Sequence, residues 1–355
     1  MKKLLIAAFA AFALGVNAQT EVNPYRPGIT ENGITYFLPN TNLHVTVKVK
    51  RVTHVPGEYC KYAERFLRLK GVTMSAYDSW ELAGVEIVPS GVANKDQAYT
   101  IKLKSKTAAP LVGLSPDGCL LTVNTPSIEI PALSVPSVGE PTTDKVSASD
   151  FKTEEISLAG STSKMAELTA DEIFDFRENR ALLAKGQADF MPKDGEQLKL
   201  MLESLDKQEN GLLQLFKGYS ITEEHTFTYD FTPKGEVNNH VLFRFSKHLG
   251  IVDADDLAGA PVCISVRDLK SLPPVAEVDG KKKEVEDLRY MVPGKAQVDL
   301  TYNRKKLISL SLPMSQFGRV EHLGGDLFNK KFTTKVTLFP ETGGIHHIDM
   351  EQPEK

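Results

Sequence analysis

Residues Leu43 to Lys50 read Leu-His-Val-Thr-Val-Lys-Val-Lys, with an apolar side chain at every second position. Successive side chains of a β-strand point to opposite faces, so this pattern predicts a strand with one buried and one solvent-facing side. The same alternation recurs from Tyr99 to Lys104. Between these segments, Pro56-Gly57-Glu58 opens and Gly71 closes a stretch with helical spacing, which predicts one helix. The part before residue 124 is therefore expected to be a sheet that carries one helix.

Alternating apolar residues return after Tyr219 and dominate the rest of the chain. The predicted strands lie at 225–231, 241–245, 262–266, 298–302, 308–312 and 332–338. No helical period separates them, so the strands are expected to pair antiparallel in a sandwich or curled sheet. Two Asp-Gly steps, Asp117-Gly118 and Asp279-Gly280, predict hairpin turns. The second step precedes three lysines, Lys281 to Lys283, which suit a solvated tip.

The central part of the chain has a helical period instead. Thr169, with Glu172 three residues later, predicts the start of one helix, and Gly186 predicts its end. A second helix is expected from near Asp194 to Gly218. The short connection between them predicts a helical hairpin.

Two sets of charged residues lie on these predicted helices. Gln208 and Glu209 interrupt the apolar stripe of the second helix. Arg177, Glu178 and Arg180 flank the stripe of the first helix, where we expect an inter-domain salt bridge. The alternative is contact with an anionic partner.

A proline-rich segment separates the first sheet from the helices. Between Asn124 and Ser149 four prolines recur every five residues, among many serines and threonines. Proline lacks an amide donor and disfavours helix in the residue before it, so an extended linker is expected. The alternative is an edge strand, because apolar residues alternate with the prolines.

We therefore predict an α+β protein with two antiparallel sheet-rich domains, the C-terminal one sandwich-like, and an intervening helical hairpin. The expected parts are a signal peptide (1–18), an N-terminal β-rich domain with one helix (19–123), a Pro/Ser/Thr-rich extended linker (124–149), a helical hairpin (150–218) and a C-terminal antiparallel β domain (219–355).

The N-terminus has the three-part layout of a secretory signal. Lys2 and Lys3 precede an apolar run from Leu4 to Leu14, and Val16-Asn17-Ala18 suits cleavage after Ala18. The alternative is a membrane anchor, but about eleven apolar residues are too few to cross a hydrocarbon layer that needs about 20. We expect export to the periplasm, the cell exterior or the outer membrane surface, with no transmembrane segment after signal cleavage.

Composition excludes several classes of protein. The chain has 355 residues, a net charge of -4 and 41% hydrophobic residues. Balanced charge with this much apolar material excludes a disordered chain, a collagen-like chain, a multi-span membrane protein and a strongly basic nucleic-acid binder. Removal of the two signal lysines makes the mature chain more acidic, so no nucleic acid is expected as a partner.

The three cysteines, Cys60, Cys119 and Cys263, are far apart in the sequence. We expect them to be small hydrophobic core residues. The alternative is one disulfide between two of them. The absence of a C-x-x-C pair excludes a short redox motif and a zinc knuckle.

Four stretches invite a chemical interpretation. Glu341, His346, His347 and Asp349 have the side chains of a zinc site, but adjacent residues of a strand point to opposite faces, so we expect exposed strand-end residues. Asp253, Asp255 and Asp256 begin like a calcium loop whose later ligand positions fail, so an acidic surface loop is expected.

Ser161-Thr162-Ser163-Lys164 spells the S-x-x-K of penicillin-recognising enzymes, without the partner motifs S-D-N or K-T-G. The segment from Gly113 to Gly118 is one residue too long for a nucleophile elbow and suits a turn. Metalloprotease, phosphate-loop and dinucleotide motifs are absent from the sequence. We therefore predict no catalytic, cofactor-binding or metal-ligating residue and no cofactor.

Several short segments carry a family resemblance. They are Gly33-Ile34-Thr35-Tyr36-Phe37-Leu38-Pro39, Pro56-Gly57-Glu58-Tyr59 with Tyr62-Ala63, Arg177-Glu178-Asn179-Arg180, Pro192-Lys193-Asp194-Gly195 and Glu341-Thr342-Gly343-Gly344. Through them most of the mature chain resembles an uncharacterised family of exported proteins from Bacteroides and its relatives, a domain of unknown function of about 350 residues. The resemblance implies export and no mechanism.

The expected function is that of an exported, soluble protein of the cell envelope, non-catalytic and structural or ligand-binding, whose partner is an envelope protein or glycan. The alternative is an envelope or secreted hydrolase that acts on peptidoglycan, protein or glycan through a site assembled from distant residues. The absence of local motifs favours the first hypothesis and leaves the second open.

Overall fold

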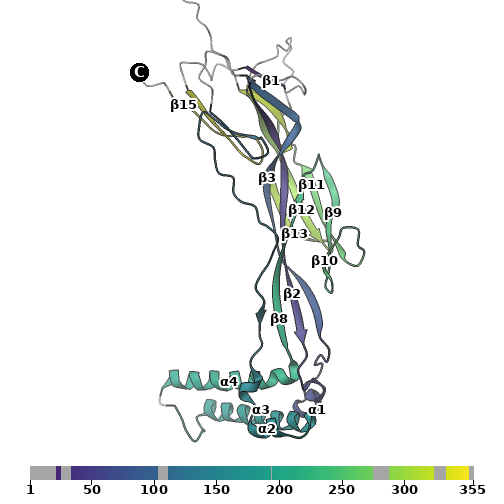
Figure 1. The fold of residues 1–355 in the computed structure, drawn as a ribbon, viewed down its shortest axis with the longest axis vertical. Helices are drawn as coiled ribbons and strands as arrows, with labels where there is room; N and C mark the ends of the chain where they lie inside the picture. The colour runs from purple at the N-terminus through teal and green to yellow at the C-terminus, as the bar shows by residue number, and fades with distance from the viewer. Residues whose placement is uncertain are drawn as a thin grey trace, which may run out of the picture.

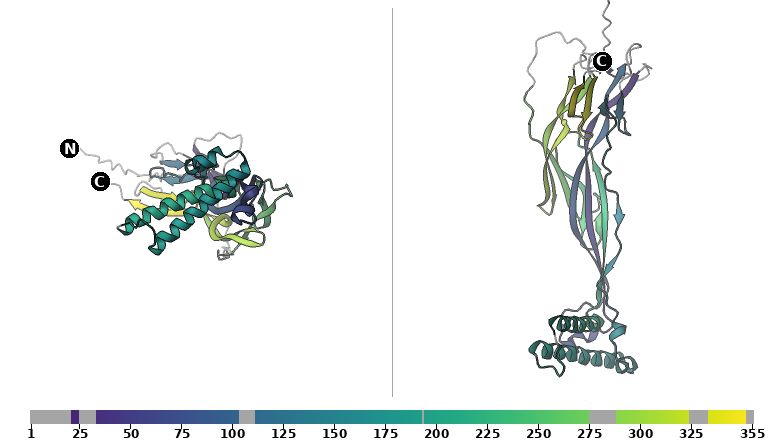
Figure 2. Two further views of the ribbon diagram at one scale, coloured as in Figure 1. Left: turned by 90° about the horizontal axis from the view of Figure 1, so that it is seen from below. Right: turned by 90° about the vertical axis from the view of Figure 1, so that its left-hand side faces the viewer.

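The computed structural model describes residues 21–24, 33–102, 111–192, 194–274, 288–323 and 333–351. The molecule is elongated: long strands run along its axis, and the helices gather at one end (Figure 1). The right-hand view in Figure 2 shows the same rod-like shape, with the helices forming a foot at one end.

The central sheet, sheet A, contains the longest strands. Its order is β1-β3-β2-β8-β6, with β7 also paired to β8. The bounds are β1 Glu21–Pro24, β2 Gly33–Val55, β3 Tyr77–Lys102, β6 Ser137–Val138, β7 Thr142–Thr143 and β8 Tyr219–Phe231. The opening alternation of Leu43 to Lys50 lies in the middle of β2, between β3 and β8.

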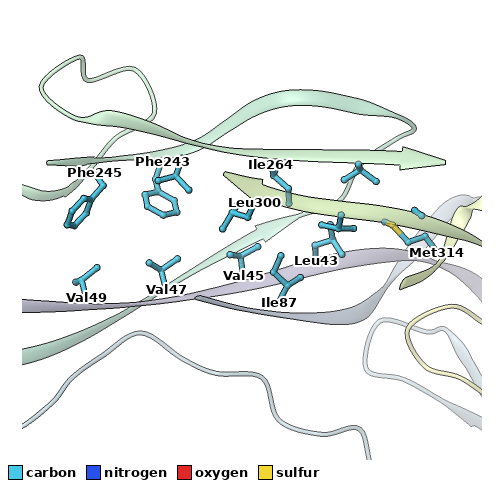
Figure 3. Close-up of a cluster of buried hydrophobic side chains, with 14 residues drawn as sticks. Leu43, Val45, Val47, Val49, Ile87, Phe243, Phe245, Ile264, Leu300 and Met314 are labelled. Atoms are coloured by element: carbon cyan, nitrogen blue, oxygen red, sulfur yellow. The ribbon is translucent and has the colours of Figure 1, made fainter. Parts of the chain in front are cut away.

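A second sheet, sheet C, packs against one face of sheet A. Its order is β10-β9-β11-β12-β13. The bounds are β9 Val237–Ser246, β10 Gly250–Val252, β11 Ala260–Asp268, β12 Leu288–Tyr302 and β13 Lys305–Leu323. Figure 3 shows Val45 and Val47 of β2 facing Phe243 and Leu300 of sheet C across a shared apolar core. The apolar residues of the alternating segment are therefore buried on one face of the strand, as predicted.

A third sheet, sheet B, lies at the end of the rod far from the helices. Its order is β15-β14-β5-β4, with bounds β4 Val112–Leu114, β5 Leu120–Val123, β14 Thr333–Leu338 and β15 Ile345–Glu351. A separate core joins it to the near ends of β2 and β3, through Tyr36, Leu38, Leu120 and Leu338 among others. The Asp117-Gly118 turn connects β4 to β5 with Gly118 at a φ of 84°, as predicted.

The foot contains the short helices and the hairpin. The bounds are η1 Cys60–Tyr62, α1 Ala63–Leu67, η2 Ala148–Phe151, α2 Glu154–Leu158, α3 Thr162–Lys185 and α4 Gly195–Lys217. Their core includes Tyr59 from the β2–β3 connection, Ile173 of α3 and Phe216 of α4. The predicted helix between the first two long strands is present as the η1–α1 pair, but it ends at Leu67, with Arg68 at a φ of 56° as its C-cap, and not at Gly71.

The predicted ends of the hairpin helices are mostly confirmed. Gly186 ends α3 at a φ of 71°, and the Asp194 side chain accepts a hydrogen bond from the Gln197 amide at 2.7 Å at the start of α4. The predicted start at Thr169 is wrong. Thr169 is buried inside α3 and donates to the Met165 carbonyl at 2.7 Å, while Ser161 caps the helix.

The α+β class with antiparallel sheets is confirmed, but the sheets do not divide as the expected domains would. Sheet A joins β2 and β3 to β8, and sheet B joins β5 to β14, so segments on both sides of residues 124–149 share two sheets. The sandwich accordingly forms between sheet C and sheet A. The residues predicted as a linker are mostly extended, and β6 and β7 within them pair with β8.

Cys60, Cys119 and Cys263 are all free, so the disulfide alternative does not apply. Cys60 and Cys119 are buried, and Cys263 is half-buried. Burial raises the pKa of the Cys119 thiol to about 11. The predicted hairpin tip at Asp279-Gly280 and the lysines after it lie outside the described residues.

Candidate functional site

A groove of about 850 Å³ lies on the face of sheet A that is turned away from sheet C. Its floor contains Asn42, Val88, Ser90 and Asp230. These residues alternate along their strands with core residues such as Leu43, so their side chains point to the opposite face. The groove is therefore built on the side of β2 that the sequence pattern assigns to solvent.

Hydrogen bonds hold the polar floor in one arrangement. The Asn42 side-chain amide donates to Asp230 Oδ1 at 2.9 Å and to Ser90 Oγ at 3.1 Å. The Thr232 hydroxyl donates to Asn42 Oδ1 at 2.9 Å. Asn42 thus uses both donors and one acceptor within the protein, which fixes the floor before any ligand arrives.

His44 lies beside this network and is almost fully buried. Its Nδ1 is 2.8 Å from Asp230 Oδ1, and its Nε2 is 2.9 Å from the carbonyl oxygen of Ser134. A carboxylate and a carbonyl both accept, so both bonds form at once only when both ring nitrogens carry a proton. The hydrogen bond from His44 also holds the pKa of the Asp230 carboxyl below its usual range.

One wall of the groove comes from the proline-rich segment. We call residues 126–136 the strap. Ile128, Ile130 and Leu133 of the strap line the groove, and Ile130 remains 43% exposed. The strap is held at its far end by the bond from His44 to Ser134.

The facing wall is the turn between β14 and β15. It contributes Phe339 and Pro340, and Phe339 is 40% exposed with His346 packed edge-on at 4.7 Å between ring centroids. The Thr41 hydroxyl donates to the Glu341 carbonyl at 2.9 Å and so ties this turn to β2.

Gly91 of β3 allows the turn to approach this closely. A Cβ atom at Gly91 would overlap the Pro340 carbonyl oxygen, so any other residue would force the turn to move. The position of the wall therefore depends on a glycine in the strand beneath it.

Acidic side chains occur around the apolar walls. Asp117, Glu129, Asp230 and Glu341 line the groove, and no lysine or arginine does within the described part of the chain. A pocket with apolar walls and a few fixed polar groups has the general character of a ligand site.

The family model for a domain of unknown function, DUF4831, matches residues 32–346. The chain belongs to the DUF4831 family. The matched range contains every residue that lines the groove, so the groove is part of the DUF4831 domain. No curated protein and no solved structure matches the chain. None of the helices in the described residues is long and apolar enough to cross a membrane.

The predicted C-terminal cluster is only partly brought together in the DUF4831 domain. Glu341 and His346 both line the groove, whereas His347 and Asp349 lie further along β15 and do not. No group of three or more histidine, cysteine or acidic side chains with the geometry of a metal site occurs among the described residues.

Two of the other candidate motifs have structural roles. Ser161 of the S-x-x-K motif is the N-cap of α3, where its hydroxyl accepts from the Lys164 amide at 3.2 Å. The Gly113–Gly118 segment forms the β4–β5 turn, and Ser115 Oγ accepts from the Cys119 amide at 2.9 Å. Asp253, Asp255 and Asp256 lie in the exposed connection between β10 and β11, as expected of a surface loop.

The arginines flagged on α3 form ion pairs within the helical hairpin. Arg177 Nε is 2.6 Å from Glu209 Oε1, and Arg180 is 2.8 Å from Glu209 Oε2. Arg180 also pairs with Asp206 at 2.5 Å. Glu209 interrupts the apolar stripe of α4 because its buried carboxylate is held by both arginines. These contacts join α3 to α4, so the expected inter-domain bridge is a bridge inside the hairpin.

Sequence reasoning missed His44 and Asp230 as members of one site. Both occupy the polar positions of alternating strands, which is the ordinary signature of a solvent-facing side. The available signal was the apolar content of the proline-rich segment, because apolar residues in an extended segment need a surface to cover.

Proposed function

We propose that this protein is an exported, non-catalytic binding protein of the cell envelope, and that its ligand occupies the groove between the strap and the β14–β15 turn. The signal-like residues 1–18 support export. The observation that carries the proposal is the groove of about 850 Å³ with apolar walls over a hydrogen-bonded polar floor.

The contacts of His44 argue against the hydrolase alternative at this position. A histidine that serves as a general base needs a free ring nitrogen to take the proton from a nucleophile. His44 is oriented by Asp230, as in such dyads, but its second nitrogen is bonded to the Ser134 carbonyl. The pair therefore anchors the strap, which is a structural role that a binding site needs.

The groove is tested with Nile red, a neutral dye that fluoresces when it enters an apolar site. We expect saturable binding to the wild-type protein and at least about tenfold weaker binding to Ile130→Asp, because a carboxylate in the wall must be desolvated. Val135→Asp is the matched control, since Val135 lies on the same strap, is 71% exposed and does not line the groove. Equal dye binding by wild type and Ile130→Asp would contradict the proposal.

Export is tested separately in the native host. The full chain is fractionated, and the mature N-terminus is sequenced. The proposal predicts a protein outside the cytoplasm that begins at Gln19. A cytoplasmic protein that retains Met1 would contradict it.

A further inference from the structure

The charged side chains around the groove are all acidic in the described part of the chain. Asp117, Glu129 and Glu341 come from three separate segments and surround the apolar walls. Within the described part of the chain, none of these three carboxylates forms an ion pair. Three unpaired carboxylates attract a cationic ligand and repel an anionic one.

The strap carries a second and independent feature. Residues 126–133 are extended, and none of them makes a backbone-to-backbone hydrogen bond within the described part of the chain. Pro126 and Pro131 have no amide hydrogen, but the carbonyl groups of the segment and the amides of its other residues are unpaired and can hydrogen-bond to another strand beside it. A peptide ligand uses these groups, whereas a small apolar molecule has no need of them.

Apolar exposure on the strap points to the same kind of ligand. Ile130 is 43% exposed and Leu133 is 37% exposed, and both face the groove that Phe339 borders from the other side. Side chains of an added strand alternate between two faces, so apolar residues of the peptide can fill the groove while the residues between them meet the carboxylates at its rim.

We propose that the occupant of the groove is an extended segment of another protein, in which apolar residues alternate with lysine or arginine, and that this segment pairs with the strap backbone. The inference rests on the proposed binding function and names the class of ligand. Asp230 is left unchanged in the test, because its Oδ1 accepts the hydrogen bonds from His44 and Asn42 that hold the groove floor and the strap.

The test uses three labelled peptides and the purified mature protein. The first peptide alternates valine with lysine and has blocked ends. The second has glutamate in place of every lysine, and the third is the lysine peptide with N-methyl groups on alternate backbone nitrogens. Fluorescence anisotropy measures binding at low salt and again with added salt.

The lysine peptide is expected to bind at least about tenfold more tightly than the glutamate peptide and to weaken as salt is added. The double variant Glu129→Gln with Glu341→Gln is expected to weaken lysine-peptide binding about threefold to tenfold, because each removed carboxylate is partly exposed to solvent. A matched double variant, Glu140→Gln with Glu178→Gln, changes two exposed carboxylates outside the groove and is expected to leave binding unchanged. N-methylation is expected to abolish binding.

Equal affinity for the lysine and glutamate peptides, or an unchanged affinity in the Glu129/Glu341 double variant, would overturn the charge argument. Undiminished binding of the N-methylated peptide would overturn strand pairing. Dye binding that depends on Ile130 without any peptide binding would overturn this inference alone and indicate a small apolar ligand. Loss of Ile130-dependent dye binding would instead remove the proposed function itself.

Discussion

His44 and Ser134 lie 90 residues apart in the chain, and the imidazole Nε2 of His44 donates to the Ser134 carbonyl oxygen at 2.9 Å. This bond fixes the strap to the outer face of β2. Because the strap forms one wall of the groove, this buried side chain of the central sheet helps to position that wall.

Replacement of His44 by alanine is expected to release the strap. The Ser134 carbonyl and the Asp230 carboxylate both lose a partner, but both are exposed and can bind water instead, so the expected loss is about 0.5–1.5 kcal/mol. Limited proteolysis should cut the strap several-fold faster than in wild type, and Nile red binding should weaken. His248→Ala, which changes an exposed turn residue, serves as the control. A strap that resists the protease equally in both variants would show that His44 does not anchor it.

Acid is expected to loosen the same region. The pKa of Asp230 is lowered in the folded protein by the hydrogen bond from His44. A lowered carboxyl pKa contributes stability that is present above the unfolded value of about 3.9 and is lost as the pH falls through the folded value. The free energy of unfolding should therefore decrease below about pH 4.

The contribution of Asp230 is isolated by comparison of two variants. Asp230→Asn should show a smaller loss of stability between neutral pH and pH 3 than wild type does, because it has no carboxylate to protonate. Asp255→Asn, in the exposed β10–β11 connection, should retain the wild-type difference. Denaturant unfolding at the two pH values measures this loss of stability in each protein. An identical pH dependence in all three proteins would contradict the role given to Asp230.

Two glycines of β3 make a matched pair for the packing of the β14–β15 turn. A Cβ at Gly91 would meet the Pro340 carbonyl, whereas a Cβ at Gly84 has no atom within 4 Å. Gly91→Ala should lower the free energy of unfolding by about 1–3 kcal/mol and weaken dye binding, because the turn must move. Gly84→Ala should do neither. Similar thermal unfolding of the two variants would contradict the close approach of the turn.

The helical hairpin is expected to depend on Glu209. Glu209→Gln leaves Arg177 and Arg180 without their shared carboxylate and should destabilise the hairpin by about 1–3 kcal/mol, since the arginines remain partly exposed. Glu203→Gln, which removes only an exposed pair with Lys199, should have little effect. Amide hydrogen exchange in α3 and α4 should be faster in Glu209→Gln than in Glu203→Gln. Equal exchange rates in the two variants would refute the dependence of the hairpin on Glu209.

The Cys119 thiol is expected to be unreactive in the folded protein. Burial raises its pKa to about 11, so almost no thiolate is present near pH 8. Iodoacetamide followed by peptide mass spectrometry should modify Cys119 only after denaturation. Rapid modification of the native protein would contradict its buried position.

Local signals predicted much of the fold. Gly186, Asp194 and Gly218 end or begin helices where their residue types suggest, and the alternation from Leu43 to Lys50 lies in a strand. The start of α3 was missed because Lys164, instead of an acidic residue, follows the Ser161 cap by three positions. A capping box at Thr169 was therefore the stronger local pattern, although that residue is interior.

The groove could not be predicted, because no local pattern carries it. Asn42, Asp230 and Ile130 belong to segments that only the pairing of β2 with β8 and the path of the strap bring together. Polar residues alternate with apolar ones along β2, and this sequence pattern is the same whether water or the strap covers the polar face. Glu341 and His346 were noted for another reason, as possible metal ligands, and their place in the groove depends on the docking of the β14–β15 turn.

Hydrogen exchange of the strap shows whether a bound peptide lies against it. Amide exchange at Glu129, Ile130, Ala132 and Leu133 is measured in the free protein and with the lysine peptide at saturation. We expect these amides to become strongly protected when the peptide is bound, while the exchange rates of amides in the helical foot do not change. Bound peptide with unaltered exchange in the strap, or with protection confined to another surface, would contradict the groove as the binding site.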